Sequence, residues 1–156
     1  MNMSITVKFS EKDLENLDNL ESDYPERIDM KGIWGMYEVR VGKIIEKENN
    51  KGVPTVSIPF NIIAGEYEGQ TIWYNQMVTE PWMFKKVAKM LTSLKTDVDL
   101  SSKNFVVDGE VDFDKYNEML AAVFDDLKSK GYEYALEYKD DGKRWGVCTI
   151  TEVFEN

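Results

Sequence analysis

The chain has 156 residues, 42% of them hydrophobic and 31% charged, a composition typical of a single globular domain. It contains no histidine and one cysteine, which excludes histidine-ligated metal sites, histidine-based catalysis and a disulfide framework. The formal net charge of −10 argues at first sight against a nucleic-acid ligand, but the charge is uneven. Residues 35–95 carry eight basic and six acidic residues. Residues 1–34 carry four basic and eight acidic residues, and residues 96–156 carry seven basic and fifteen acidic residues. The middle of the chain is therefore the part that suits an anionic ligand.

The first predicted element is a short amphipathic helix over residues 10–20, with Ser10 as its N-cap and Asp13 three positions later. Its leucines recur at spacings of three and form one apolar stripe. That stripe fits either a helix laid on the surface of the domain or a contact with a second copy or another partner. An acidic connecting segment follows, so we assign residues 1–34 to an N-terminal helix and linker and residues 35–156 to the domain.

Three strands are predicted next, at residues 36–45, 55–63 and 70–78, separated by polar or glycine-rich turns. Gly42 interrupts the first strand and predicts a bulge that bends it. Pro59 lies within the second strand and cannot donate a ladder hydrogen bond, so it predicts a local edge or a bulge there.

Two helices follow the strands. One is predicted over residues 79–94, with Thr79 as its cap and Pro81 in its first turn. The other, over residues 112–131, begins at an aspartate cap and ends at a glycine, and its apolar residues recur along one face.

The C-terminal part is a predicted hairpin, with strands at residues 132–138 and 144–154 joined by a turn that contains Asp-Gly. Five short antiparallel strands with a helical connection between the third and the fourth match the OB-fold barrel. We therefore predict an α+β chain: a five-stranded antiparallel OB-fold-like barrel with two helices between strands 3 and 4 and a short N-terminal helix. The helical insertion covers residues 79–131.

Motifs for catalysis or metal binding are weak. Paired carboxylates such as Asp125 and Asp126 fall on a polar helix face, in turns or in loops, where a solvated surface is the simpler interpretation. Residues 108–118 resemble an EF-hand loop but lack its regular spacing of oxygen ligands. Cys148 has no histidine partner and fits a small buried apolar residue better than a nucleophile. We expect no enzymatic activity, no metal and no cofactor.

The stretch GEYEGQTIWYNQ, residues 65–76, places the adjacent Trp73 and Tyr74 on opposite faces of a strand. One ring packs in the core and the other is free to stack on bases, but the pattern does not say which. In OB-folds, strands 2 and 3 form the ligand face, where rings stack bases and lysines attract phosphates. The predicted nucleic-acid-binding residues are Trp73, Tyr74, Tyr37, Arg40, Lys43, Lys47, Lys51, Asn61, Asn75, Lys85 and Lys86.

A pattern of turn glycines, strand residues and helix leucines runs through the middle of the chain: Gly35, Tyr37, Lys51, Gly52, Val56–Ile62, Gly65–Gly69, Ile72, Trp73, Asn75, Leu91 and Leu94. By this pattern, residues 35–95 resemble a family of small bacteriophage proteins that are encoded among replication and recombination genes. The final hairpin resembles that family loosely, and the acidic N-terminal segment and the helix at 112–130 are additions to its pattern. The resemblance implies an OB-fold that binds single-stranded DNA.

We therefore expect a non-enzymatic single-stranded DNA-binding protein of a phage replication or recombination system. Its expected partners are single-stranded DNA and phage replication or recombination proteins, and the leucine stripe allows a homodimer. The lack of a leader and of an apolar run near 20 residues predicts a cytoplasmic viral protein of the bacterial host cell, without a membrane partner. The acidic flanks favour an alternative function, a DNA mimic that inhibits a basic host nuclease or immune effector.

Overall fold

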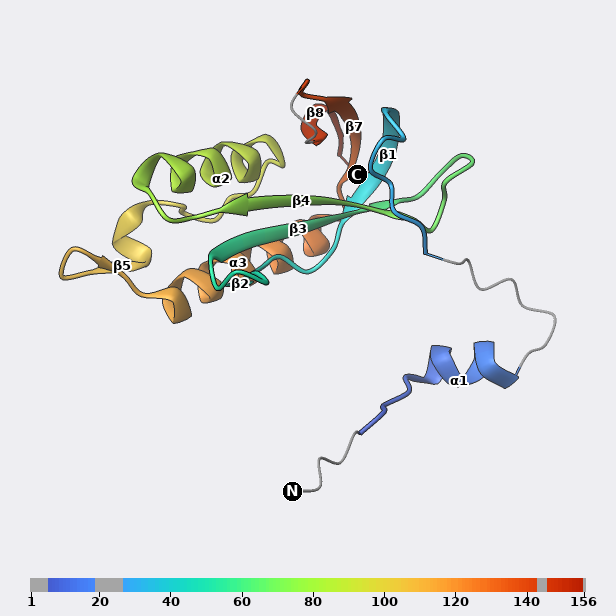
Figure 1. Ribbon diagram of the computed structural model, residues 1–156, viewed down its shortest axis with the longest axis horizontal. Coiled ribbons are helices and arrows are strands. Elements are labelled where there is room, and N and C mark those ends of the chain that lie inside the picture. The colour runs from blue at the N-terminus through green and yellow to red at the C-terminus, as the bar shows by residue number, and fades with distance from the viewer. Residues whose placement is uncertain (1–5, 19–26, 143–145, 156) are drawn as a thin grey trace.

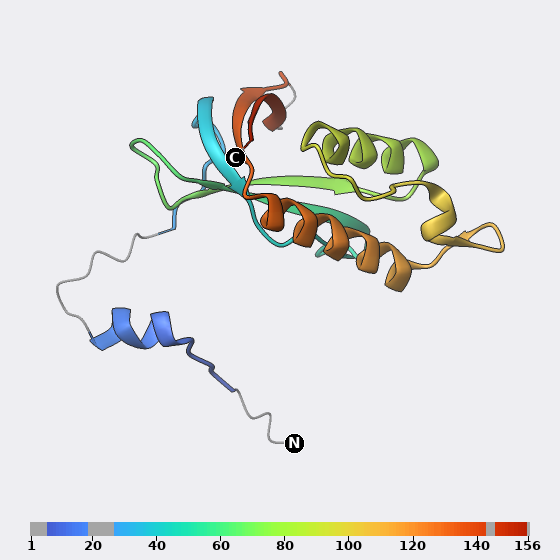
Figure 2. The same ribbon diagram turned by 180° about the vertical axis from the view of Figure 1, so that it is seen from behind.

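The computed structural model describes residues 6–18, 27–142 and 146–155. The first element is α1 (Glu11–Asp18), which stands apart from the rest of the molecule in Figures 1 and 2. Its predicted capping box is confirmed, because the Ser10 hydroxyl accepts from the Asp13 amide and the Asp13 carboxylate accepts from the Ser10 amide. Leu14 and Leu17 of the stripe are exposed, and Leu20 lies outside the described residues.

Six strands form one antiparallel sheet in the order β2-β3-β1-β7-β8, and β4 pairs with β3 on its other edge. The half that contains β1, β7 and β8 rises steeply from the half that contains β2, β3 and β4 (Figure 1). The strands are β1 (Gly35–Val41), β2 (Ile45–Glu48), β3 (Pro54–Ile62), β4 (Thr71–Met77), β7 (Glu133–Asp140) and β8 (Gly146–Phe154).

The predicted first strand, residues 36–45, is wrong as one continuous element. It breaks after Val41 into β1 and β2, and the Gly42 amide there donates to the Pro59 carbonyl at 2.8 Å. A Cβ at Gly42 would lie 2.8 Å from Cγ of Pro59, so only glycine fits beside the proline ring. The bend and the proline thus occupy the same place in the sheet, where β3 exchanges β2 for β1 as its neighbour.

The α+β class and the antiparallel sheet are confirmed, but the predicted closed barrel is not present. Within the described residues β4 pairs only with β3, and β8 pairs only with β7. The sheet therefore stays open between β4 and β8, and it has six strands rather than five because the bent first strand is divided.

Two helices cover the inner face of the sheet, α2 (Pro81–Ser93) beside β4 and α3 (Phe113–Lys130) beside β2 (Figures 1 and 2). The predicted caps of α3 are confirmed: Asp112 accepts from two backbone amides and Gly131 is left-handed. Thr79 is not the cap of α2, whose N-cap is Glu80 without a side-chain hydrogen bond. A 3-10 turn (Ser102–Asn104) and the small hairpin of β5 (Val106–Val107) and β6 (Glu110–Val111) join the two helices.

The core lies between the inner face of the sheet and these two helices. Phe60, Tyr116 and Tyr134 are among its largest fully buried side chains. The segment before β1 also packs on the sheet, because Met30 is buried and the Ile28 amide donates to the Gln70 side chain at 2.9 Å. Residues 27–31 are thereby held beside the start of β4.

Candidate nucleic-acid interface

The two adjacent aromatic residues of β4 have opposite environments. Trp73 is 51% exposed on the outer face of the sheet. Tyr74 faces inward and packs against the core, where burial raises the pKa of its hydroxyl to about 12. Trp73 is therefore the more exposed of the two rings, and the predicted contact role of Tyr74 remains a prediction.

Around Trp73, the outer face carries a ladder of small polar pairs between β3 and β4. Trp73 lies opposite Pro59, with one polar pair on each side of it. The Ser57 hydroxyl donates to the Asn75 side chain at 2.7 Å, and the Thr71 hydroxyl donates to the Asn61 side chain at 2.8 Å. The result is a low polar floor from which one large ring projects.

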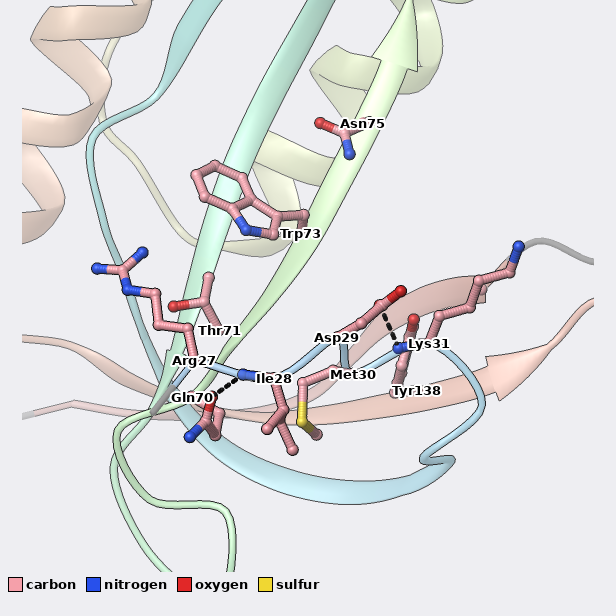
Figure 3. A pocket seen from close by; sticks show the side chains of 11 residues that line it. Arg27, Ile28, Asp29, Met30, Lys31, Gln70, Thr71, Trp73, Asn75 and Tyr138 are labelled. Atoms are coloured by element: carbon pink, nitrogen blue, oxygen red, sulfur yellow. Dashed lines mark hydrogen bonds between the residues drawn. The ribbon is translucent and has the colours of Figure 1, made fainter. Parts of the chain in front are cut away.

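Three adjoining hollows, here called together the β4 furrow, follow this strand. The first, of about 500 Å³, lies between residues 27–31 and β4, with Thr71 and Trp73 in its lining. Figure 3 shows the Arg27 guanidinium on the same side of this hollow as the Thr71 side chain and the Trp73 indole. The second, of about 590 Å³, is lined by residues 73–76 and 146–150 and by one side of α2. The third, of about 540 Å³, leads to the β2–β3 turn.

The furrow has a modest excess of positive charge. Three carboxylates line it, those of Asp29, Glu48 and Asp141. The basic residues that line it are Arg27, Lys31, Lys47, Lys86 and Lys89. This balance contrasts with the chain as a whole, whose net charge is −10.

The structure brings together some of the predicted contact residues and separates the others. Lining the furrow are Trp73, Tyr74, Asn75, Lys47 and Lys86, and Asn61 belongs to its polar floor. The predicted residues outside the furrow lining are Tyr37, Arg40, Lys43, Lys51 and Lys85.

Each of the separated residues has its own environment. Tyr37 is half-buried on the inner side of β1 and donates its hydroxyl to the Ile33 carbonyl at 2.7 Å. Arg40 forms an ion pair with Glu133 on the neighbouring strand. Lys43 borders a shallow hollow with the carboxylates of α3. The exposed Lys51 lies in the β2–β3 turn, and Lys85 projects from α2 away from the furrow.

The sequence analysis did not identify the basic residues of the furrow that lie outside the three predicted strands. Arg27 and Lys31 belong to the predicted linker, and only the packing of Met30 and the bond from Ile28 to Gln70 hold them against β4. Lys89 of α2 is not among the predicted contact residues, although it lines the furrow. Its spacing of three from Lys86 places both on one side of α2, which is the signal that could have identified it.

The described residues offer little for catalysis. Cys148 is half-buried, and burial raises the pKa of its thiol to about 12, so the reactive thiolate is disfavoured. Among residues 6–18, 27–142 and 146–155, no group of three or more carboxylates or thiols could hold a metal ion. None of the helices described is both long and apolar enough for a membrane crossing.

Comparison with protein-family models identifies the family of the chain. A family model described as "Protein of unknown function (DUF669)" matches residues 32–132, from just before β1 to just after α3. The matched range includes β3, β4 and α2, which form most of the furrow, and it ends before the β7–β8 hairpin. No curated protein matches the chain. The chain therefore belongs to the DUF669 family.

Proposed function

We propose that this member of the DUF669 family is a non-enzymatic protein that binds single-stranded DNA along the β4 furrow. The observation that carries the proposal is Trp73, half-exposed above a polar floor and flanked by basic side chains on both sides. An indole in this position stacks on any base, because every base has an aromatic face. The lysines and Arg27 attract the backbone without reading its sequence.

Strand connectivity supports an OB-type fold as the basis of this surface. With β1 and β2 counted as one bent strand, the chain forms a three-stranded meander, a helical connection and a hairpin. The bent first strand pairs with the second and the fourth, as in an OB-fold, and the closing pair is absent among the described residues. OB-folds are partly open barrels that bind oligonucleotides on their second and third strands, which correspond here to β3 and β4.

A phage replication or recombination system is the setting that we propose from the sequence resemblance. In that setting the protein protects or presents unpaired strands in the host cytoplasm, and partner proteins of the same system handle the DNA. The alternative of an acidic DNA mimic has weaker support. The exposed carboxylates Asp114, Glu118 and Asp125 of α3 are interspersed with Lys115 and Lys128, so the helix does not present a continuous negative face.

Fluorescence anisotropy with a labelled oligo-dT tests the proposal directly. Wild-type protein should bind this strand more tightly than a duplex of the same length. Trp73→Ala should weaken binding about 5- to 150-fold, because one stacked base contributes about 1–3 kcal/mol.

The matched control is Trp82→Ala, since Trp82 is 54% exposed on α2 and does not line the furrow. Lys86 lies over the Trp82 ring at 5.2 Å from its centroid, so this variant removes that contact but keeps the charge of Lys86. We expect a change below about twofold for that variant. No binding by the wild-type protein at low salt, or equal losses for the two tryptophan variants, would contradict the proposed function.

A further inference from the structure

The second hollow of the furrow is bordered by two strand edges. Neighbouring residues of a strand point to opposite faces, so a hollow lined by consecutive residues is bordered by the edge of that strand. Here the lining takes residues 73–76 from β4 and residues 146–150 from β8. Neither strand has a second partner in the described part of the chain. We call this hollow the β4–β8 seam.

At the seam, which α2 borders through Lys86, Lys89, Met90 and Ser93, neither edge carries in its own sequence the usual protection against pairing. Exposed edge strands normally have charged residues, a proline or a cover that prevents the addition of a strand. β4 reads TIWYNQM and β8 begins GVCTIT, so both edges at the seam lack charge and proline.

β2 shows the contrast. The Asn117 side chain of α3 accepts from the Glu46 amide at 2.7 Å and donates to the Glu46 carbonyl at 3.2 Å. One amide group of a helix therefore occupies the hydrogen-bonding positions of this strand edge.

The described chain also contains a segment suited to the seam. Residues 6–10 lie before α1 and alternate between polar and apolar side chains, and their apolar members, Val7 and Phe9, are 71% and 57% exposed. The helix that follows reads EKDLENLD, which is predominantly acidic. The α2 side of the seam carries Lys86 and Lys89, so the acidic α1 that follows the segment is complementary to these lysines, whereas residues 6–10 themselves contribute one charge, that of Lys8.

We infer that residues 6–10 of a second copy of this chain add as a strand in the β4–β8 seam, so that two copies exchange their N-terminal segments. Strand addition to an open edge gives backbone hydrogen bonds, and alternate side chains provide the specificity. The segment stands apart from its own sheet (Figures 1 and 2), which favours exchange between copies, and reciprocal exchange closes both seams in a symmetric dimer. The docking does not require the proposed function.

Analytical ultracentrifugation of the full chain without nucleic acid tests the exchange. The wild-type protein should dimerise in the micromolar range. Val7→Glu with Phe9→Glu should raise the dimer dissociation constant at least about tenfold, and so should Val147→Glu, which changes a 44% exposed side chain in the seam. Val107→Glu is the matched control, because it adds the same charge at a 41% exposed valine of β5, and it should leave the constant within about twofold.

A photo-crosslink identifies the contact itself. Phe9→p-benzoylphenylalanine in a mixture of 14N- and 15N-labelled protein should crosslink to residues 73–76 or 146–150 of the differently labelled copy. The inference is overturned if the wild-type protein stays monomeric at about 100 μM. It is also overturned if a dimer forms but its dissociation constant does not respond to the Val7 and Phe9 changes, or if the crosslinks join residues of the same copy. Docking and DNA would share Trp73, Lys86 and Lys89, so the docked segment competes with oligo-dT for this part of the furrow. The two proposals still fail separately, because the exchange is tested without nucleic acid and oligo-dT binding has its own assay.

Discussion

At the scale of single residues, the Tyr134 hydroxyl connects the sheet to the end of α2. It donates to the Leu94 carbonyl at 2.8 Å inside the core, and burial raises the pKa of the hydroxyl. Leu94 is the C-cap of α2, where carbonyl groups lack partners within the helix. The hydrogen bond therefore satisfies a helix end in a place that water does not reach.

Tyr134→Phe should remove this donor and leave the aromatic packing in place. We expect the free energy of unfolding to fall by about 1–2 kcal/mol, because the buried carbonyl then lacks its partner. Urea denaturation with an unchanged m-value measures the loss. Tyr67→Phe serves as the control, since the hydroxyl of this half-buried tyrosine forms no hydrogen bond within the described residues. Equal stability losses for the two variants would show that the hydroxyl of Tyr134 contributes nothing specific.

At the scale of elements, Asp126 holds the loop after α2 against α3. Its carboxylate accepts from the Thr96 hydroxyl and the Asp97 amide, both at 2.8 Å, and from Lys130 at 3.2 Å. Partial burial disfavours the charged form, but these three hydrogen bonds outweigh it and lower the pKa of Asp126. Since the folded state has the lower pKa, this carboxylate stabilises the fold above the unfolded pKa, and that contribution is lost as the pH falls through the folded value.

Asp126→Asn should therefore destabilise the protein by about 1–2 kcal/mol at pH 7, and the difference from wild type should shrink toward pH 3. Urea midpoints at both pH values measure it. The control is Asp125→Asn, which changes the exposed neighbour on the same helix and should alter neither midpoint by more than about 0.5 kcal/mol. A destabilisation of Asp126→Asn that is the same at pH 7 and pH 3 would contradict the role of its charge.

Elements with local signals were predictable from the sequence, and features that depend on contacts across the fold were not. The bounds of α3 follow from its cap residue and its terminal glycine, both of which act within one turn. The break of the first strand depends on the fit of Gly42 beside Pro59, which lies on another strand. The choice between Trp73 and Tyr74 depends on which face of β4 the helices cover. The alternation of side chains along the strand puts the two rings on opposite faces but does not say which face is covered.

The candidate site divides in the same way. The strand that forms the furrow was predictable, and Asn75 with it, whereas the choice of Trp73 as the outward ring was not. Arg27 was not, because its place depends on the anchoring of the preceding segment by Met30 and Ile28. Lys85 and Lys86 are adjacent in sequence, but they point to different sides of α2, and only the packed helix shows which of them faces the furrow.

At the scale of the whole molecule, a net charge of −10 opposes the proposed binding of DNA, whereas the basic residues that line the furrow favour it. Charges further apart than about 10 Å are largely screened at 0.1 M salt, so the local lysines dominate binding above this concentration. Each phosphate that they neutralise contributes about −0.7 to the slope of log K against log salt for a single strand. Lys86→Ala with Lys89→Ala should therefore make that slope shallower by about 0.7–1.4 between 0.1 and 0.3 M salt, and affinity should fall for every sequence alike.

Lys85→Ala with Lys103→Ala is the matched control, since it removes the same number of charges from side chains that do not line the furrow. The net charge of the two double variants is identical, so a general electrostatic effect would change their salt slopes equally. A local effect changes only the slope of the Lys86 and Lys89 variant. Anisotropy titrations with oligo-dT at several salt concentrations distinguish these outcomes, and equal slopes for both variants would place the strand elsewhere on the molecule.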